Sequence, residues 1–207
     1  DTERYKLGVE ASFQSGKTGV ATVAGGDKVS LDGFGLAGEF EYRPDQSRWK
    51  FGLKSGIATG DDPATDSKYE GYIFNRNYDV AFLLFNHPLG QNDFSRSYLI
   101  GGNPQNGRVE TADTNTITNV TYASLYADYK WSDRFTIVGS LTSGWFSEKA
   151  ATTIGSQQKD AGYETDFTLR FSPKAGVVWD NQVGLLFPGA AFKGGGTYEA
   201  GFAYGFG

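Results

Sequence analysis

The residues that could carry acid–base or nucleophilic chemistry are few in this 207-residue chain. His87 is the only histidine, cysteine is absent, and Asp93, Ser95 and Ser97 follow His87 closely. An esterase or lipase needs a serine nucleophile held beside a histidine base, and the sequence contains no GxSxG motif that would position one. We therefore expect no catalytic residues and no enzymatic activity.

An acidic run lies in the segment GDDPATD, which contributes Asp61, Asp62 and Asp66. Calcium binds about 6 to 8 oxygen ligands, and the spacing of these carboxylates is not that of an EF-hand loop. We interpret the run as a solvated loop, and we predict neither a metal site nor a cofactor.

A larger set of charged residues alternates with apolar residues along extended segments. Side chains in a β-strand point alternately to its two faces, so these charges share one face and the apolar residues share the other. Opposite charges at adjacent positions of the polar face could form ion pairs. The set, which we predict to form a charge network, comprises Glu39, Glu41, Lys50, Lys54, Asp128, Lys130, Glu164, Asp166, Arg170 and Asp180.

The clearest elements that would position these charges lie between Tyr122 and Trp145. Apolar and polar residues alternate with period 2 on both sides of a tight turn at 132–134, which predicts a β-hairpin with one apolar and one polar face. Leu125 and Leu141 are assigned to the apolar face, and Ser124, Ser140 and Thr142 to the polar face. Aromatic residues cluster beside the turn, and Trp145 lies at the far end. This placement is typical of the interfacial belts of a transmembrane hairpin.

The same alternation predicts an all-β fold, and the chain contains no apolar run of the roughly 18 to 20 residues that a transmembrane helix needs. The expected structure is a single domain over residues 1–207, a transmembrane antiparallel β-barrel with a long loop insertion at about 61–118. Its eight predicted strands cover residues 5–13, 33–42, 49–57, 122–131, 135–145, 163–171, 177–187 and 198–206.

The connections between these strands alternate in length. Those near 43–48, 132–134 and 173–176 are short, whereas the others are long, as in outer-membrane barrels with short periplasmic turns and longer outer loops. Each strand also carries an aromatic residue at the short-turn end, which predicts an aromatic belt there. Its members are Tyr5, Tyr42, Trp49, Trp131, Phe135, Phe171, Trp179 and Phe206.

In these features the chain resembles the bacterial outer-membrane β-barrel proteins. Its last strand, YEAGFAYGFG, is similar to their C-terminal strand, which ends in or near an aromatic residue recognised by the assembly machinery; here Phe206 is penultimate. Eight strands resemble the small OmpA- and OmpX-type barrels, and the C-terminal half of a larger porin would show the same strands.

The polar face would then line the barrel interior. Pairing of Tyr42 with Trp49 predicts Glu41 beside Lys50 and places Glu39 near Lys50 and Gly52. An eight-stranded barrel has an interior just wide enough for its own side chains, and buried charges there must pair. One interpretation is a closed plug of ion pairs, and the alternative is a conducting constriction.

The 61–118 segment carries an unbroken apolar run at Val80–Phe85 and a second at Tyr98–Ile100. Such runs do not remain free in water. Three interpretations are open: an added strand pair that makes ten strands, a plug in or over the barrel mouth, or burial against another subunit or in lipid. The residues predicted to contact a partner or lipid are Val80, Phe82, Leu83, Leu84, Phe85, Tyr98 and Leu99.

These observations predict an integral protein of the bacterial outer membrane with a structural or interaction role, self-associating through the 61–118 loop as a homo-oligomer. Membrane lipid is the expected partner. The alternative function is a porin-type passive channel, either narrow or the C-terminal part of a larger barrel. The net charge of −5 argues against nucleic acid as a partner.

Overall fold

The structure is a computed structural model. It describes residues 4–21, 28–62, 67–75, 77–85, 117–148, 158–192 and 203–206. Within these ranges the chain forms one sheet with eight antiparallel strands and has no α-helix. The predicted all-β class is therefore confirmed. No helix in the part of the chain that the structure describes is long and apolar enough to cross a membrane.

Strands follow one another in the sheet in the order β1-β2-β3-β5-β6-β7-β8-β9, and the short β4 pairs with β2. A one-turn 3-10 helix, η3, covers Ala190–Phe192. The strands are β1 Tyr5–Ala21, β2 Lys28–Tyr42, β3 Trp49–Ala58, β4 Lys68–Tyr69, β5 Val120–Lys130, β6 Phe135–Phe146, β7 Asp160–Lys174, β8 Val177–Pro188 and β9 Ala203–Phe206.

The first hairpin is longer than its apolar pattern predicted. The first predicted strand ends at residue 13 and the second begins at residue 33, but Ser15 pairs with Asp32 and Lys17 pairs with Ser30. Pairing of the two backbones does not require an apolar face, so the polar ends of β1 and β2 continue the ladder beyond the last alternating apolar residue.

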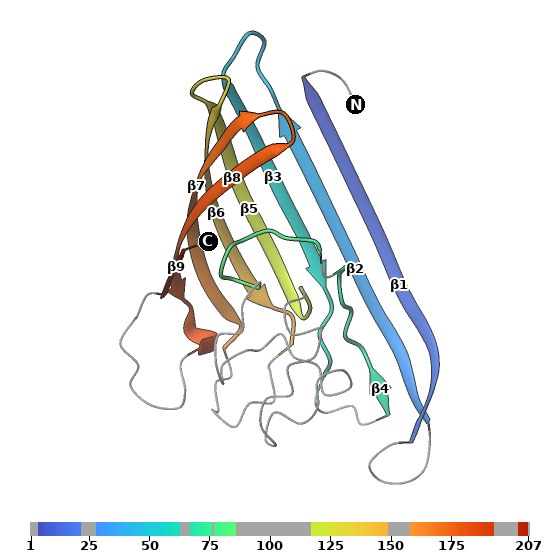
Figure 1. Cartoon of the computed structure of the whole chain (residues 1–207). Coiled ribbons are helices and arrows are strands. Elements are labelled where there is room, and N and C mark those ends of the chain that lie inside the picture. The colour runs from blue at the N-terminus through green and yellow to red at the C-terminus, as the bar shows by residue number, and fades with distance from the viewer. Residues whose placement is uncertain are drawn as a thin grey trace.

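The sheet is strongly curved but not closed. Figure 1 shows β1 at one edge and β9 at the other, and no pairing joins them in the described part of the chain. The structure therefore confirms a curved antiparallel sheet, and it does not show closure of that sheet into the predicted barrel.

The register between β2 and β3 differs from the prediction by two residues. Tyr42 pairs with Phe51, whereas Trp49 pairs with Tyr129 of β5. Neighbouring strands are staggered at this end of the sheet. Beyond β2, the Arg43 N–H donates to the Arg4 carbonyl beside β1 (2.8 Å), whereas before β3 the Arg48 carbonyl accepts the N–H of Lys130 on β5 (2.8 Å). A two-residue shift keeps every side chain on its predicted face, whereas a one-residue shift would have reversed all of them.

Strands β3 and β5 are direct neighbours, so the segment between them adds no strand to that part of the sheet. Among its described residues, β4 pairs in parallel with β2, and Ile73 forms an isolated bridge with Thr118. The added strand pair, one of the three interpretations of this segment, is not present in residues 67–75 and 77–85. Residues 77–85 instead run across the concave face of the sheet (Figure 1).

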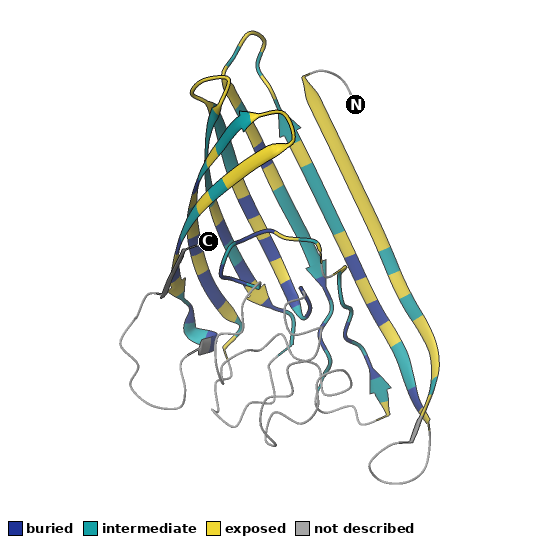
Figure 2. Ribbon diagram, in the orientation of Figure 1, coloured by how far each residue is buried: buried dark blue, intermediate teal, exposed yellow. Residues whose placement is uncertain are grey.

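The two faces of the sheet have opposite character, as predicted. Leu125 and Leu141 pair across β5 and β6 on the outer face, where their side chains are 58% and 50% exposed. Ser124 and Thr142, one position away, are buried on the concave face. Figure 2 shows this alternation along the strands. The outer face is therefore largely apolar, whereas the concave face carries polar residues and, toward the loop ends of β5–β8, an apolar cluster.

Aromatic residues gather at the short-turn ends of neighbouring strands. Ring centroids lie 5.1 Å apart for Tyr5 and Tyr42, and 4.6 Å apart for Phe135 and Phe171. Phe206 departs from the predicted belt. It pairs with Val183, four positions along β8 from Trp179, because β9 aligns with the middle of β8.

Candidate functional site

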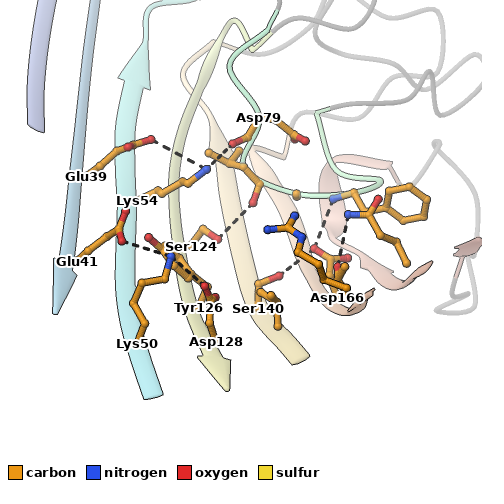
Figure 3. Close-up of a pocket in the computed structure, with 17 residues that line it drawn as sticks. Glu39, Glu41, Lys50, Lys54, Asp79, Ser124, Tyr126, Asp128, Ser140 and Asp166 are labelled. Carbon is orange, nitrogen blue, oxygen red and sulfur yellow. Dashed lines mark hydrogen bonds and ion pairs between the residues drawn. The ribbon is translucent and has the colours of Figure 1, made fainter. Parts of the chain in front are cut away.

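A pocket of about 380 Å³ lies on the concave face between the strands and the segment Asp79–Phe82 (Figure 3). Six successive strands of the sheet path contribute to its wall, from β2 to β8, which shows how far the sheet wraps around it. The lining residues are Glu39, Glu41, Lys50, Lys54, Asp79, Val80, Ala81, Phe82, Ser124, Tyr126, Asp128, Val138, Ser140, Asp166, Thr168, Arg170 and Gln182.

Lys50 is at the centre of the charges on β2, β3 and β5. It is the register partner of Asp128, and its Nζ lies 2.8 Å from that carboxylate and 3.3 Å from the carboxylate of Glu41. The Tyr126 ring packs over Gly52, where a Cβ would collide with it, and its centroid lies 5.4 Å from Lys50 Nζ. The Glu41–Lys50 pair expected from the sequence is therefore present despite the change in register.

A second pair connects the sheet to the segment that crosses it. Lys54 is the register partner of Glu39, with 4.0 Å between Nζ and the carboxylate. The same ammonium group donates a hydrogen bond of 2.8 Å to the backbone carbonyl of Asp79. Lys54 thus holds one end of the crossing segment against β3.

Two further predicted basic residues have separate partners. Arg170 and Asp180 face each other across β7 and β8 and form a bidentate ion pair, with N–O distances of 2.9 and 2.7 Å. Lys130 pairs with Asp133 at the exposed turn, 2.9 Å away, and does not line the pocket.

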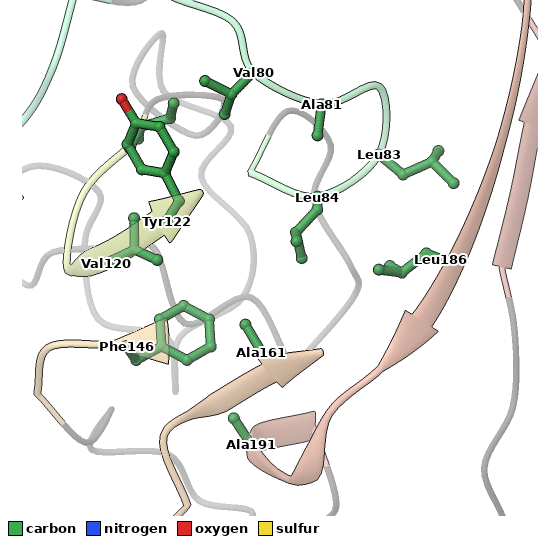
Figure 4. Packing of buried hydrophobic residues seen from close by; sticks show 11 residues of the cluster. Val80, Ala81, Leu83, Leu84, Val120, Tyr122, Phe146, Ala161, Leu186 and Ala191 are labelled. Carbon is green, nitrogen blue, oxygen red and sulfur yellow. The ribbon is translucent and has the colours of Figure 1, made fainter. Parts of the chain in front are cut away.

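The apolar part of the crossing segment is buried inside this chain (Figure 4). Leu84 is only 1% exposed, and Val80 and Leu83 are also buried. They belong to one cluster with inward side chains from the loop ends of β5–β8 and neighbouring residues, namely Val120, Tyr122, Phe146, Ala161, Leu186 and Ala191. Packed in this way, Val80, Leu83 and Leu84 do not present the surface that contact with a partner or lipid would require.

Polar side chains of the wall bond to the backbone of the same segment. Thr142 and Ser124 donate to the carbonyl of Val80 at 3.2 and 3.3 Å. The fully buried carboxylate of Glu164 accepts the N–H of Leu83 at 2.6 Å and that of Leu84. Backbone groups removed from water need such partners, so these bonds fix the path of the segment.

Asp166, which lines the pocket, also hydrogen-bonds the backbone of the crossing segment. One of its oxygens accepts the hydroxyl of Ser140 at 3.0 Å and the N–H of Phe82 at 3.4 Å. We name the crossing residues 78–85 the inner segment. It is held by side chains of β3, β5, β6 and β7.

The inner-wall hydroxyl groups were not identified as functional residues from the sequence. Ser124, Ser140 and Thr142 were assigned correctly to the polar face, but nothing in their spacing indicates a backbone partner. The apolar run Val80–Phe85 could have indicated such partners, because the backbone N–H and C=O groups of a buried segment need polar side chains nearby.

The acidic run has a structural role in the described residues. Asp61 accepts the backbone N–H of Glu70 at 3.0 Å, and burial raises the pKa of Asp61 above its usual range. No group of three or more potential metal ligands occurs in the ranges that the structure describes. Asp66 lies outside those ranges, as do His87, Asp93, Ser95, Ser97, Tyr98 and Leu99.

No protein-family model matches this chain, and the search of curated proteins gave no match.

Proposed function

We propose that this protein is an integral β-barrel of the bacterial outer membrane and acts as a passive channel. The outward positions support the membrane part of the proposal, since large apolar side chains such as Leu7, Phe13 and Leu125 are widely exposed there. A contiguous apolar exterior over a polar interior is the pattern of a lipid-facing barrel wall.

The observation that carries the channel proposal is the charged pocket beside the inner segment. The inner segment lies along the wall rather than filling the concave space, and a pocket of about 380 Å³ with residues of both charges remains next to it. Charged side chains that line a narrow aqueous passage set which solutes can cross it.

The same geometry favours a channel over self-association through the inner segment. The self-association hypothesis needs the apolar residues of this segment on an outer surface, whereas Val80, Leu83 and Leu84 are buried against strands of their own chain. Of the three interpretations of the apolar run, the geometry matches the plug best, in the form of a partial plug.

A wider barrel accommodates these features better than an eight-stranded one. The interior of an eight-stranded barrel is filled by its own side chains, whereas this concave face also holds the inner segment and a pocket. In lipid the edges of β1 and β9 must both be paired, because unsatisfied backbone groups are costly there. The proposal therefore includes barrel strands beyond the eight of the sheet path.

Single-channel recording with the full-length chain in planar bilayers tests the proposed function. The sharpest comparison uses two adjacent residues on opposite faces, Ser140→Trp and Leu141→Trp. An indole at position 140 enters the pocket and should lower the conductance of each channel, whereas one at position 141 faces outward and should leave it unchanged. A chain that inserts but never conducts would contradict the proposal, and so would equal effects of the two variants.

A further inference from the structure

We infer that the proposed channel prefers cations over anions, because its pocket carries more acidic than basic groups and every basic group is already paired. This inference rests on the proposed function and specifies the class of solute.

The lining of the pocket has five acidic residues and three basic residues, a formal difference of −2. The acidic residues are Glu39, Glu41, Asp79, Asp128 and Asp166, and the basic residues are Lys50, Lys54 and Arg170. Just outside the lining, Lys6 lies 3.9 Å from Glu41 and Asp180 pairs with Arg170. Including Lys6 and Asp180 adds one positive and one negative charge, so the formal charge difference between acidic and basic groups remains −2.

Each basic group that lines the pocket is held by a carboxylate. Lys50 lies between Glu41 and Asp128, and Lys54 pairs with Glu39. Arg170 has both carboxylate oxygens of Asp180 as partners. An anion in the pocket would therefore have to compete with an internal partner for every cationic group.

Two further acidic groups of the lining form no close ion pair of their own among the described residues, because the three basic groups lie closest to the carboxylates of Glu41, Asp128, Glu39 and Asp180. Asp166 bonds to a hydroxyl and a backbone N–H, and it forms no ion pair with a lysine or arginine among the described residues. The Asp79 carboxylate accepts the backbone N–H groups of Val80 and Ala81 on the inner segment and interacts with the charge of Lys54, which Asp79 shares with Glu39. Both carboxylates lie at the border between the inner segment and the open pocket.

Uncompensated negative charge in a confined polar space raises the local concentration of cations and lowers that of anions. The effect extends over about 10 Å at 0.1 M ionic strength and falls to about 3 Å at 1 M. A cation preference that originates in the pocket should therefore be strongest in dilute salt.

The test is the ratio of K⁺ to Cl⁻ permeability, obtained from reversal potentials of the full-length chain in planar bilayers under a KCl gradient near 0.1 M. The unmodified channel should give a ratio above one. Asp166→Asn and Asp79→Asn should each lower it, and the double variant should bring it close to one. Asparagine keeps an acceptor oxygen for the backbone of the inner segment, so the fold should persist. Lys50→Gln should change the ratio in the opposite direction.

Asp133→Asn is the matched control, because this carboxylate is 96% exposed at the short turn and does not line the pocket. It should leave the ratio unchanged. A conducting channel with a ratio at or below one would overturn the cation preference alone, and so would a ratio that Asp79→Asn and Asp166→Asn do not alter. Absence of any conductance would overturn the channel and its selectivity together.

Discussion

The carboxylate of Glu164 on β7 accepts the backbone N–H of Leu83, 81 positions earlier in the chain, at 2.6 Å. The next N–H, that of Leu84, bonds to the other oxygen of the same carboxylate. Glu164 is fully buried, and no lysine or arginine forms an ion pair with it in the part of the chain that the structure describes. One side chain therefore satisfies two consecutive backbone donors of the inner segment and fixes its position on the wall.

Glu164→Ala should release the inner segment while the sheet remains folded. A buried backbone donor that loses its acceptor costs roughly 1 to 3 kcal/mol, and here two consecutive N–H groups lose theirs. The expected results are faster proteolysis within residues 78–85 and a larger, noisier single-channel conductance. Glu164→Gln retains one acceptor oxygen and should show an intermediate effect.

Glu10→Gln is the matched control, because Glu10 is an exposed residue of the edge strand β1, and the inner segment is held by β3, β5, β6 and β7. It should behave as the unmodified chain in both measurements. Unchanged proteolysis and conductance in Glu164→Ala would show that the apolar contacts of Val80, Leu83 and Leu84 suffice to hold the segment.

The placement of the inner segment could not be predicted from sequence, and the reason is physical. A run such as Val80–Phe85 indicates that burial is needed but does not identify the surface that provides it. Its partners, among them Tyr122, Phe146 and Leu186, come from three different strands and lie on the face that is polar elsewhere. A plug in or over the barrel mouth was therefore one of three open interpretations, and the sequence did not distinguish it from the other two.

Lys50 and Asp128 should be energetically coupled. Each is about three-quarters buried, so their ion pair is intermediate between an exposed and a fully buried one. Lys50→Met would leave Asp128 beside Glu41 without the cation between them and should destabilise the fold by roughly 1 to 3 kcal/mol. Asp128→Asn in the same chain should recover part of this loss.

Urea unfolding of the four members of this double-mutant cycle in lipid vesicles gives the coupling free energy. Lys174→Met, at an exposed position near the end of β7, is the control and should change stability by less than about 0.5 kcal/mol. Additive effects of the Lys50 and Asp128 changes would show that the two groups do not interact significantly.

Strands and faces were predictable because a period of 2 is a local property of the sequence. Leu125 and Leu141 were assigned outward and Ser124 and Thr142 to the opposite face, and all four lie as predicted. The pairing of Tyr42 with Phe51 was not predictable in the same way, because the register of one hairpin depends on what the strands on its two sides pair with.

Asp61 provides a test of pH dependence outside the strands. Burial raises the pKa of Asp61, and the negative charges of Glu70 and Asp62 add to this effect. A raised pKa in the folded state means that the contribution of Asp61 to stability is full below about pH 3.9, the ordinary aspartate value, and is lost as the pH rises through the folded pKa. Asp61→Asn keeps the acceptor for the Glu70 N–H but cannot ionise.

The variant Asp61→Asn should therefore be more stable than the unmodified chain at pH 7, and this difference should shrink as the pH falls toward 4. Thermal unfolding of both proteins across that range measures it. A difference that is the same at both pH values would show that ionisation of Asp61 does not contribute.

The substitution Leu141→Arg tests whether the outer face of the sheet contacts lipid or water. Leu141 is 50% exposed on the outer face, so an arginine there meets no steric obstacle and should be nearly neutral if water surrounds the sheet. If lipid surrounds it, an arginine near the bilayer midplane costs about 2 to 4 kcal/mol. We expect the second result for folding into lipid vesicles, with Leu125→Arg on the neighbouring strand behaving alike.

Ser132→Arg, at the exposed turn, is the control and should be tolerated. If Leu141→Arg is tolerated as well as Ser132→Arg, the outer face does not contact the hydrocarbon of a membrane.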